Sequence, residues 1–250
     1  MVDLDPIVER IAAQVAAIGG VTAVALGGSR ARGDHRADSD WDLGVFYRGA
    51  LDTDAIRALR YSGQIFEPHQ WGPVINGGAW LDIEGRRVDL VYQDLDEVER
   101  WTADCEAGTF EIHRLVGYAA GIPTYNAVGA LAEAVVLHGT LPRPTFPDAL
   151  RETAPPIWRN LAAGALATAA VHARRRELAT CIVELGLAAL SEAHARCCAR
   201  GEWVLSEKGL LERAGLTSIN RLIDGPERLL TRVQLVREHL ALEVAWGPSD

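Results

Sequence analysis

Residues 21–47 read VTAVALGGSRARGDHRADSDWDLGVFY, two apolar segments separated by a glycine pair and a polar stretch. The apolar run over 21–26 predicts a buried strand, and the Gly-Gly pair that follows predicts a tight turn into a short helix with Ser29 at its N-cap. A polar stretch then leads to a second predicted strand over 41–47. Strands joined by short helices in this way are typical of an α+β domain.

Two carboxylates stand at the start of the second strand. Because side chains on a strand alternate between faces, Asp40 and Asp42 project from one face and Trp41 from the other. Two close like charges are costly unless a cation neutralises them, and Mg²⁺ prefers such oxygen ligands together with substrate phosphates. A solvated strand face is the alternative interpretation, since most charged side chains are simply exposed.

Two further features strengthen the first interpretation. Gly28 lets the backbone approach a ligand, and amides at the start of the following helix favour an anion such as a phosphate. A strand predicted over 87–92 presents Asp89 among apolar residues, where an unpartnered carboxylate would be expensive. We expect its partner to be a metal shared with the other two acids, or a neighbouring arginine, Arg86 or Arg87.

The glycine-serine turn, the Asp-x-Asp strand and the later acid together resemble the polymerase-β-like nucleotidyltransferase superfamily over residues 20–92. The form GSRARG…SDWDL is most similar to small bacterial members, including minimal nucleotidyltransferases and the aminoglycoside and lincosamide adenylyltransferases. The resemblance implies a mixed sheet with flanking helices, followed in many antibiotic-modifying members by a helical domain. The residues that carry it are Gly28, Ser29, Asp40, Asp42 and Asp89.

The resemblance also implies a reaction. A nucleoside monophosphate, AMP from ATP, would pass to a hydroxyl of a small molecule such as an aminoglycoside, with release of pyrophosphate. Mg²⁺ in a two-metal arrangement is the expected cofactor, and ATP is the co-substrate. The three acids would be catalytic and metal-binding, with Asp89 either a ligand or the general base. The implied nucleotide-binding residues are Gly28, Ser29, Arg32, Ser39 and Lys208.

Three basic residues keep alternative roles. Arg30 and Arg32 either meet the triphosphate or pair with Asp34 and Asp38. Lys208 is the only lysine of the chain. Its surroundings are similar to a segment of aminoglycoside adenylyltransferases in which a lysine reaches the phosphates, as a compact point charge can. An ordinary surface lysine is the alternative.

Other elements of the first half follow from apolar spacing and turn residues. Helices are predicted over 5–18 and 52–61. Strands are predicted over 74–83 and 87–92, joined by a hairpin turn at residues 84–86.

From Asp94 the spacing is helical, interrupted by Gly121-Ile122-Pro123 and by the proline-rich stretch at 141–147. An Ala- and Leu-rich stretch over 157–200 predicts one long helix or two, and further helices are expected near 207–214 and 225–245. We therefore predict an α+β fold with a nucleotidyltransferase domain over 1–115 and an all-α helical bundle over 116–250.

Composition excludes several classes of protein. The 250 residues are 48% hydrophobic and 24% charged, which is ordinary globular composition. The net charge of −9 argues against a nucleic-acid binder, and the four cysteines and seven histidines show no zinc-ligand spacing. No export signal or apolar run of membrane-spanning length is evident, so we expect a cytoplasmic protein without membrane association.

The charge is unevenly distributed. Residues 1–124 hold 11 basic and 20 acidic side chains, which accounts for the whole −9. Such a negative field would attract a cationic acceptor. The competing hypothesis is an antitoxin-like partner protein that binds a nucleotide without turnover or that transfers AMP to a protein. The sequence leaves the oligomeric state open.

Overall fold

The computed structural model describes residues 4–33, 35–36 and 39–241, so Asp34 and Asp38 lie outside the described residues. The chain divides into two compact units. The first contains residues 1–104, 111–113 and 123–145, and the second contains residues 105–110, 114–122 and 146–250.

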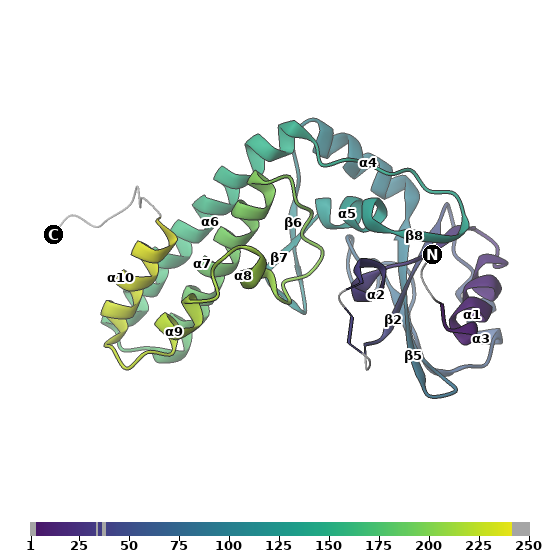
Figure 1. Ribbon diagram of the computed structural model, residues 1–250, viewed down its shortest axis with the longest axis horizontal. Coiled ribbons are helices and arrows are strands. Elements are labelled where there is room, and N and C mark those ends of the chain that lie inside the picture. The colour runs from purple at the N-terminus through teal and green to yellow at the C-terminus, as the bar shows by residue number, and fades with distance from the viewer. Residues whose placement is uncertain (1–3, 34, 37–38, 242–250) are drawn as a thin grey trace. The chain divides into compact units, whose positions relative to one another are not determined.

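A six-stranded mixed sheet lies at the centre of the first unit, in the order β3-β4-β5-β2-β1-β8. Figure 1 labels three of its strands, β2, β5 and β8. Strands β2 and β5 run parallel, and every other pair is antiparallel. The strands are β1 (Val21–Leu26), β2 (Trp41–Tyr47), β3 (Ser62–Ile65), β4 (Gly78–Ile83), β5 (Arg86–Asp94) and β8 (Val135–Gly139).

The core of this unit lies on one face of the sheet. Helix α1 buries Val8, Ile11 and Val15 against strand residues such as Leu43 and Leu90, all of them fully inaccessible to solvent. The apolar spacing that predicted this helix is the stripe that packs on the sheet. The helices of the unit are α1 (Pro6–Ala16), α2 (Gly28–Arg32), α3 (Thr53–Ala58), α4 (Leu95–Glu106, whose last two residues fall in the second unit) and α5 (Tyr125–Glu133).

A two-residue turn joins β4 to β5. Glu84 and Gly85 both have positive φ, 54° and 78°, as the tightest hairpin turns require. Arg86, which we predicted in the turn, is already the first residue of β5 and pairs with Ile83. This single position sets which side chains of the two strands face each other.

Part of the predicted helical half is strand. Residues 112–115 (β6) and 118–123 (β7) form a two-stranded sheet, and β8 pairs with β1 at the edge of the main sheet. The helical interpretation was wrong there because pairing partners distant in the sequence override local spacing. For the same reason the first unit includes residues 123–145, which lie beyond the division that we predicted at 115/116.

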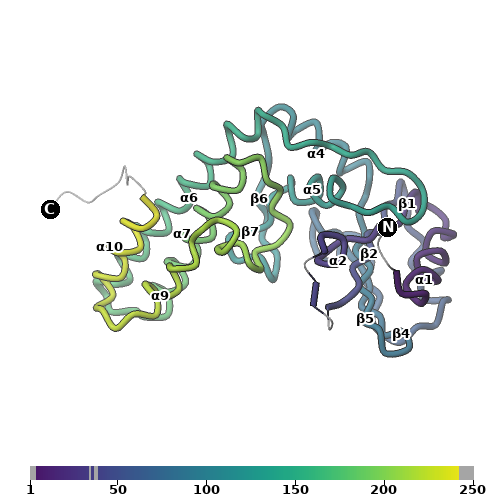
Figure 2. The backbone as a smooth tube through the Cα atoms, viewed as in Figure 1, coloured from purple at the N-terminus to yellow at the C-terminus, as the bar shows by residue number. Residues whose placement is uncertain are grey.

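Helices make up most of the second unit, and α6 and α7 run alongside each other (Figure 2). The stretch 157–200 therefore holds parts of two helices. By length and composition α7 is the one helix, within the described part of the chain, that could cross a membrane, but half of its apolar window is buried. The helices are α6 (Asp148–Arg174), α7 (Leu178–Ala199), α8 (Leu210–Arg213), α9 (Ile219–Ile223) and α10 (Leu229–Leu240).

Candidate active site

The glycine turn after β1 packs directly against the second acid of β2. The Gly27 N–H donates to the Asp42 carbonyl over 2.8 Å. Gly28 has φ +61°, and a Cβ at this position would lie 1.8 Å from Asp42 Oδ2. Only glycine fits both the backbone conformation and the space, so the turn and the carboxylate form one unit.

Gly27 is also the N-cap of α2, without a side-chain hydrogen bond. The predicted N-cap, Ser29, is instead the second residue of this helix. Gly27 has extended backbone that lets its carbonyl accept from Ala31, and it needs no side chain to begin the helix.

Asp42 and Asp89 face each other across the parallel strands β2 and β5. They are direct partners in the register, so both project from the face opposite the core, which we call the site face. Their neighbours Leu43 and Leu90 point into the core and are fully buried. The sheet therefore fixes two carboxylates side by side, about 5 Å apart at their backbones.

Asp40 lies just before β2 and makes an ion pair. Its Oδ1 is 2.7 Å from Arg87 Nε, although it is buried and forms no well-aligned hydrogen bond. Among residues 4–33, 35–36 and 39–241 no three His, Cys, Asp or Glu side chains are arranged to hold a metal ion. The structure thus brings Asp42 and Asp89 together, while Asp40 contacts the arginine.

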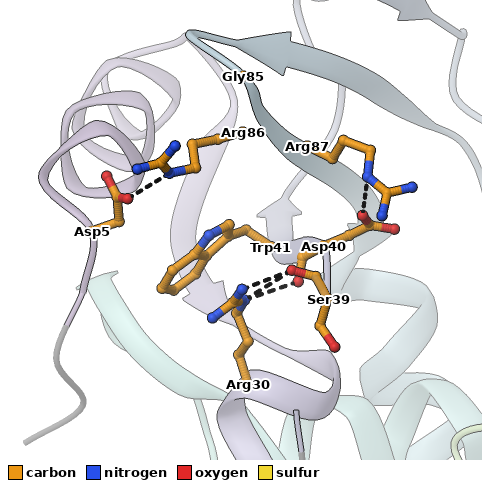
Figure 3. Close-up of a pocket in the computed structure, with 8 residues that line it drawn as sticks. All are labelled: Asp5, Arg30, Ser39, Asp40, Trp41, Gly85, Arg86 and Arg87. Carbon is orange, nitrogen blue, oxygen red and sulfur yellow. Dashed lines mark hydrogen bonds and ion pairs between the residues drawn. The ribbon is translucent and has the colours of Figure 1, made fainter. Parts of the chain in front are cut away.

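Arg30 fastens α2 to the start of β2 (Figure 3). Its Nη2 donates to the Ser39 carbonyl over 2.7 Å, and its Nε lies 3.2 Å from the carbonyls of both Ser39 and Asp40. The guanidinium also stacks on the ring of Trp41, 3.9 Å from the centroid. The side chain thus holds the backbone of the acidic motif. Its alternative partners Asp34 and Asp38 lie outside the described residues, and a role of Arg30 towards the triphosphate stays a prediction.

A cavity of about 390 Å³ opens beside this clamp (Figure 3). Its three arginines are each engaged: Arg30 with the carbonyls, Arg86 with Asp5, and Arg87 with Asp40. Neither Asp42 nor Asp89 lines it, so we place the chemistry on the site face rather than in this cavity. It is lined by Asp5, Arg30, Ser39, Asp40, Trp41, Gly85, Arg86 and Arg87.

The other predicted nucleotide-binding residues fall in two places. Arg32 is exposed near the end of α2, and the Ser39 hydroxyl accepts from the Arg36 N–H over 2.9 Å. Lys208 is exposed in the second unit, where its N–H donates to the Ser206 hydroxyl. Its neighbour Glu207 accepts from two backbone amides of β7 and is nearly buried, and burial raises the pKa of this carboxyl. The roles of Arg32, Ser39 and Lys208 towards a nucleotide stay predictions.

The residue types on the site face fit a divalent cation. Two carboxylates held in register supply hard oxygen ligands, and the absence of a side chain at position 28 lets the Asp42 carboxylate lie against the glycine turn.

One known family model matches part of the chain. Residues 8–104 match the nucleotidyltransferase domain family. The first unit has the nucleotidyltransferase fold. The predicted α+β architecture, with a mixed sheet followed by a helical part, is confirmed.

A solved structure also resembles the chain. It is a nucleotidyltransferase-like protein from Exiguobacterium sibiricum 255-15, 14% identical, with a TM-score of 0.46 over 94% of this chain and 72% of that chain. No curated protein matches the sequence. Neither comparison points to antibiotic adenylyltransferases in particular.

Proposed function

We propose that the protein transfers a nucleoside monophosphate, AMP from ATP, to a hydroxyl of a small molecule and releases pyrophosphate. The observation that carries the proposal is the pairing of Asp42 with Asp89 across β2 and β5, with Gly28 packed on Asp42. In this arrangement, phosphates held by the glycine turn would lie beside two carboxylates able to bind a metal, within the residues that match the nucleotidyltransferase domain family.

Each residue has a role in this proposal. Asp42 and Asp40 would hold Mg²⁺ together with the triphosphate, and Gly28 and Ser29 would hold the phosphates through their backbone. Bound Mg²⁺ would supply charge neutralisation at the phosphates and make the acceptor hydroxyl more acidic. Asp89 would then accept the proton of that hydroxyl or share the metal.

The ion pair between Arg87 and Asp40 fits a site that exchanges its counter-ion. The guanidinium balances the charge of Asp40, and a cation bound beside Asp40 would take over that role. Arg87 is two-thirds exposed and exposed ion pairs are weak, so the exchange would cost little.

The acceptor would be a polar, cationic molecule, and an aminoglycoside-type antibiotic is the first to test. The whole net charge of −9 resides in residues 1–124, which favours encounter with a cation at low salt. We also infer a cytoplasmic location and no nucleic-acid partner, in keeping with this charge.

Asp42→Asn tests the proposal, with Asp54→Asn as its matched control. Asp54 lies in α3, its side chain is 91% exposed, and it pairs with Arg57 away from the site face. With ATP, Mg²⁺ and a panel of aminoglycosides and lincosamides, mass spectrometry should find a nucleotide added by the wild type. Asp42→Asn should lower this transfer at least about 100-fold, and Asp54→Asn should change it less than about threefold.

Equal activity of Asp42→Asn and the wild type would refute the proposal. Absence of pyrophosphate release with every acceptor, together with co-purification of a second small protein, would instead support the antitoxin-like alternative. A radiolabel from ATP on a polypeptide would indicate transfer to a protein.

A further inference from the structure

Three aromatic side chains cluster at one edge of the site face. The ring centroid of Trp80 is 5.3 Å from that of Trp71, nearly parallel at 26°, and 4.8 Å from that of Phe66, which meets it edge-on. The ring centroids of Phe66 and Trp71 are 5.1 Å apart. These are the distances and angles of attractive aromatic contacts, so the three rings support one another.

A glycine makes room for this cluster. A Cβ on Gly78 would lie 2.6 Å from the ring of Trp71, so the indole occupies the space of the missing side chain. Gly78 and Trp80 are two residues apart on β4 and project from the same face. Trp71 therefore packs over Gly78 and stacks on the neighbouring Trp80.

Trp80 is in register with the acids of the candidate site. It pairs with Asp89 across β4 and β5, and Asp89 pairs with Asp42 across β5 and β2. The three side chains form one row across neighbouring strands, about 5 Å from one strand to the next. Trp80 is thus the neighbour of Asp89 on the side away from Asp42.

Half of the Trp80 side chain is exposed, which is unusual for the largest apolar residue in a strand. The aromatic cluster holds the indole rigid, so a ligand that covers it would not have to order it first. An exposed, immobilised indole beside a row of carboxylates is suited to a flat ring.

We propose that Trp80 is the stacking platform for a ring of the acceptor molecule, whose hydroxyl then reaches Asp89. This inference rests on the proposed function and names the class of acceptor: a neutral or cationic compound with a hydroxyl on a ring, either a planar aromatic ring or a saturated sugar ring that stacks through its C–H face. Anionic rings are disfavoured because Asp82 and Asp89 flank Trp80 on the site face.

The acceptor ring and the nucleotide would bind at different strands of the site face. Gly28, which would hold the phosphates, contacts Asp42 on β2. Trp80 lies two strands away on β4, with Asp89 between. A ring on Trp80 is therefore on the opposite side of Asp89 from the phosphates, where an attacking hydroxyl belongs.

Saturation-transfer NMR on the full-length protein tests the platform without relying on turnover. The probes are a series of aminoglycosides, with saturated amino-sugar rings, and a series of cationic hydroxyaryl compounds. At least one series should receive saturation at its ring protons from the wild type. Trp80→Ala should weaken that binding about tenfold, and Trp80→Phe should keep it within about threefold. The series that binds identifies the kind of ring.

Two controls isolate the effect. Val116→Ala removes a side chain that is 99% exposed and lies outside the candidate site, and it should leave binding unchanged. Binding of a non-hydrolysable ATP analogue with Mg²⁺ should be the same in Trp80→Ala and the wild type. If Trp80→Ala does not fold by circular dichroism, Trp80→Gln takes its place.

The inference is overturned if neither series binds the wild type, if Trp80→Ala binds the rings as the wild type does, or if it loses the nucleotide analogue instead. Ring binding that depends on Trp80, with no nucleotide transfer to any compound, would support the platform and count against the proposed function alone.

Discussion

Alanine substitutions at Gly28 and at Gly33 distinguish two reasons for a glycine: its contact with Asp42 and its left-handed backbone. Helix α2 begins at Gly28 and is followed by Gly33, and both glycines have left-handed backbone, with φ of +61° and +77°. Their surroundings differ. A Cβ at Gly28 would meet Asp42 Oδ2 at 1.8 Å, whereas a Cβ at Gly33 would have nothing within 4 Å.

The two substitutions therefore share one cost and differ in another. Alanine in a left-handed conformation costs about 1 to 2 kcal/mol at either position. At Gly28 the Asp42 carboxylate must also withdraw, because ordinary contacts to a Cβ begin near 3.4 Å. The required shift is about 1.5 Å, and misplacement of a catalytic group by an ångström can cost about 100-fold in rate.

Urea unfolding and the nucleotide-transfer assay measure the two costs. We expect Gly33→Ala to lose about 1 kcal/mol of stability and to keep transfer within about fivefold. Gly28→Ala should lose at least as much stability and about 100-fold in transfer. Equal transfer by the two variants would refute the claim that Gly28 is required by Asp42.

Two further predictions concern residues that hold each unit together. Arg30→Lys keeps the charge but loses the planar guanidinium that binds two carbonyls and stacks on the Trp41 indole. The free energy of unfolding should fall by about 1 kcal/mol, and the rate of nucleotide transfer should fall through kcat. Arg10→Lys, at an exposed ion pair, is the control and should change neither. His194 is fully buried, and burial lowers its pKa to about 3. Below about pH 6.5 His194 therefore binds a proton in the unfolded chain but not in the folded chain. The free energy of unfolding should fall by up to about 1.4 kcal/mol for each pH unit between pH 6.5 and pH 3. The raised pKa of Glu207 has the opposite effect on stability, because the folded chain then binds a proton more tightly than the unfolded chain. In His194→Gln the fall of Tm between pH 6 and pH 4 should therefore become smaller or reverse. A slope of Tm against pH equal to that of the wild type would contradict this account.

The part of the fold that depends on local pattern could be predicted from the sequence. Strands β1 and β2 have the predicted bounds, because an apolar run and a regular alternation end at turn residues on both sides. The placement of Asp42 opposite Asp89 does not follow from local pattern, because it requires β2 and β5 to be parallel neighbours in one particular register. Edge strand β8 could not be predicted, since its residues 135–139 become a strand only through pairing with β1, more than 100 residues earlier.

The role of Arg30 could not be read from its spacing. An arginine close to a glycine turn and to two acids is equally suited to a phosphate, a carboxylate or a backbone carbonyl. Its choice of the Ser39 and Asp40 carbonyls depends on where Trp41 lies, because the indole supports one face of the guanidinium. A tertiary contact of this kind leaves no periodic signal in the sequence.

The length of the turn between β4 and β5 determines which residue of β5 lies opposite Trp80. With Glu84 and Gly85 alone in the turn, Ile83 pairs with Arg86, and the register places Trp80 opposite Asp89. A three-residue turn that included Arg86, as we predicted, would pair Ile83 with residue 87 and Trp80 with Leu90. Since side chains alternate along a strand, that register would bring an exposed indole against a core residue. The left-handed conformations of both turn residues exclude it, so the platform beside Asp89 depends on the tolerance of Glu84 and Gly85 for positive φ.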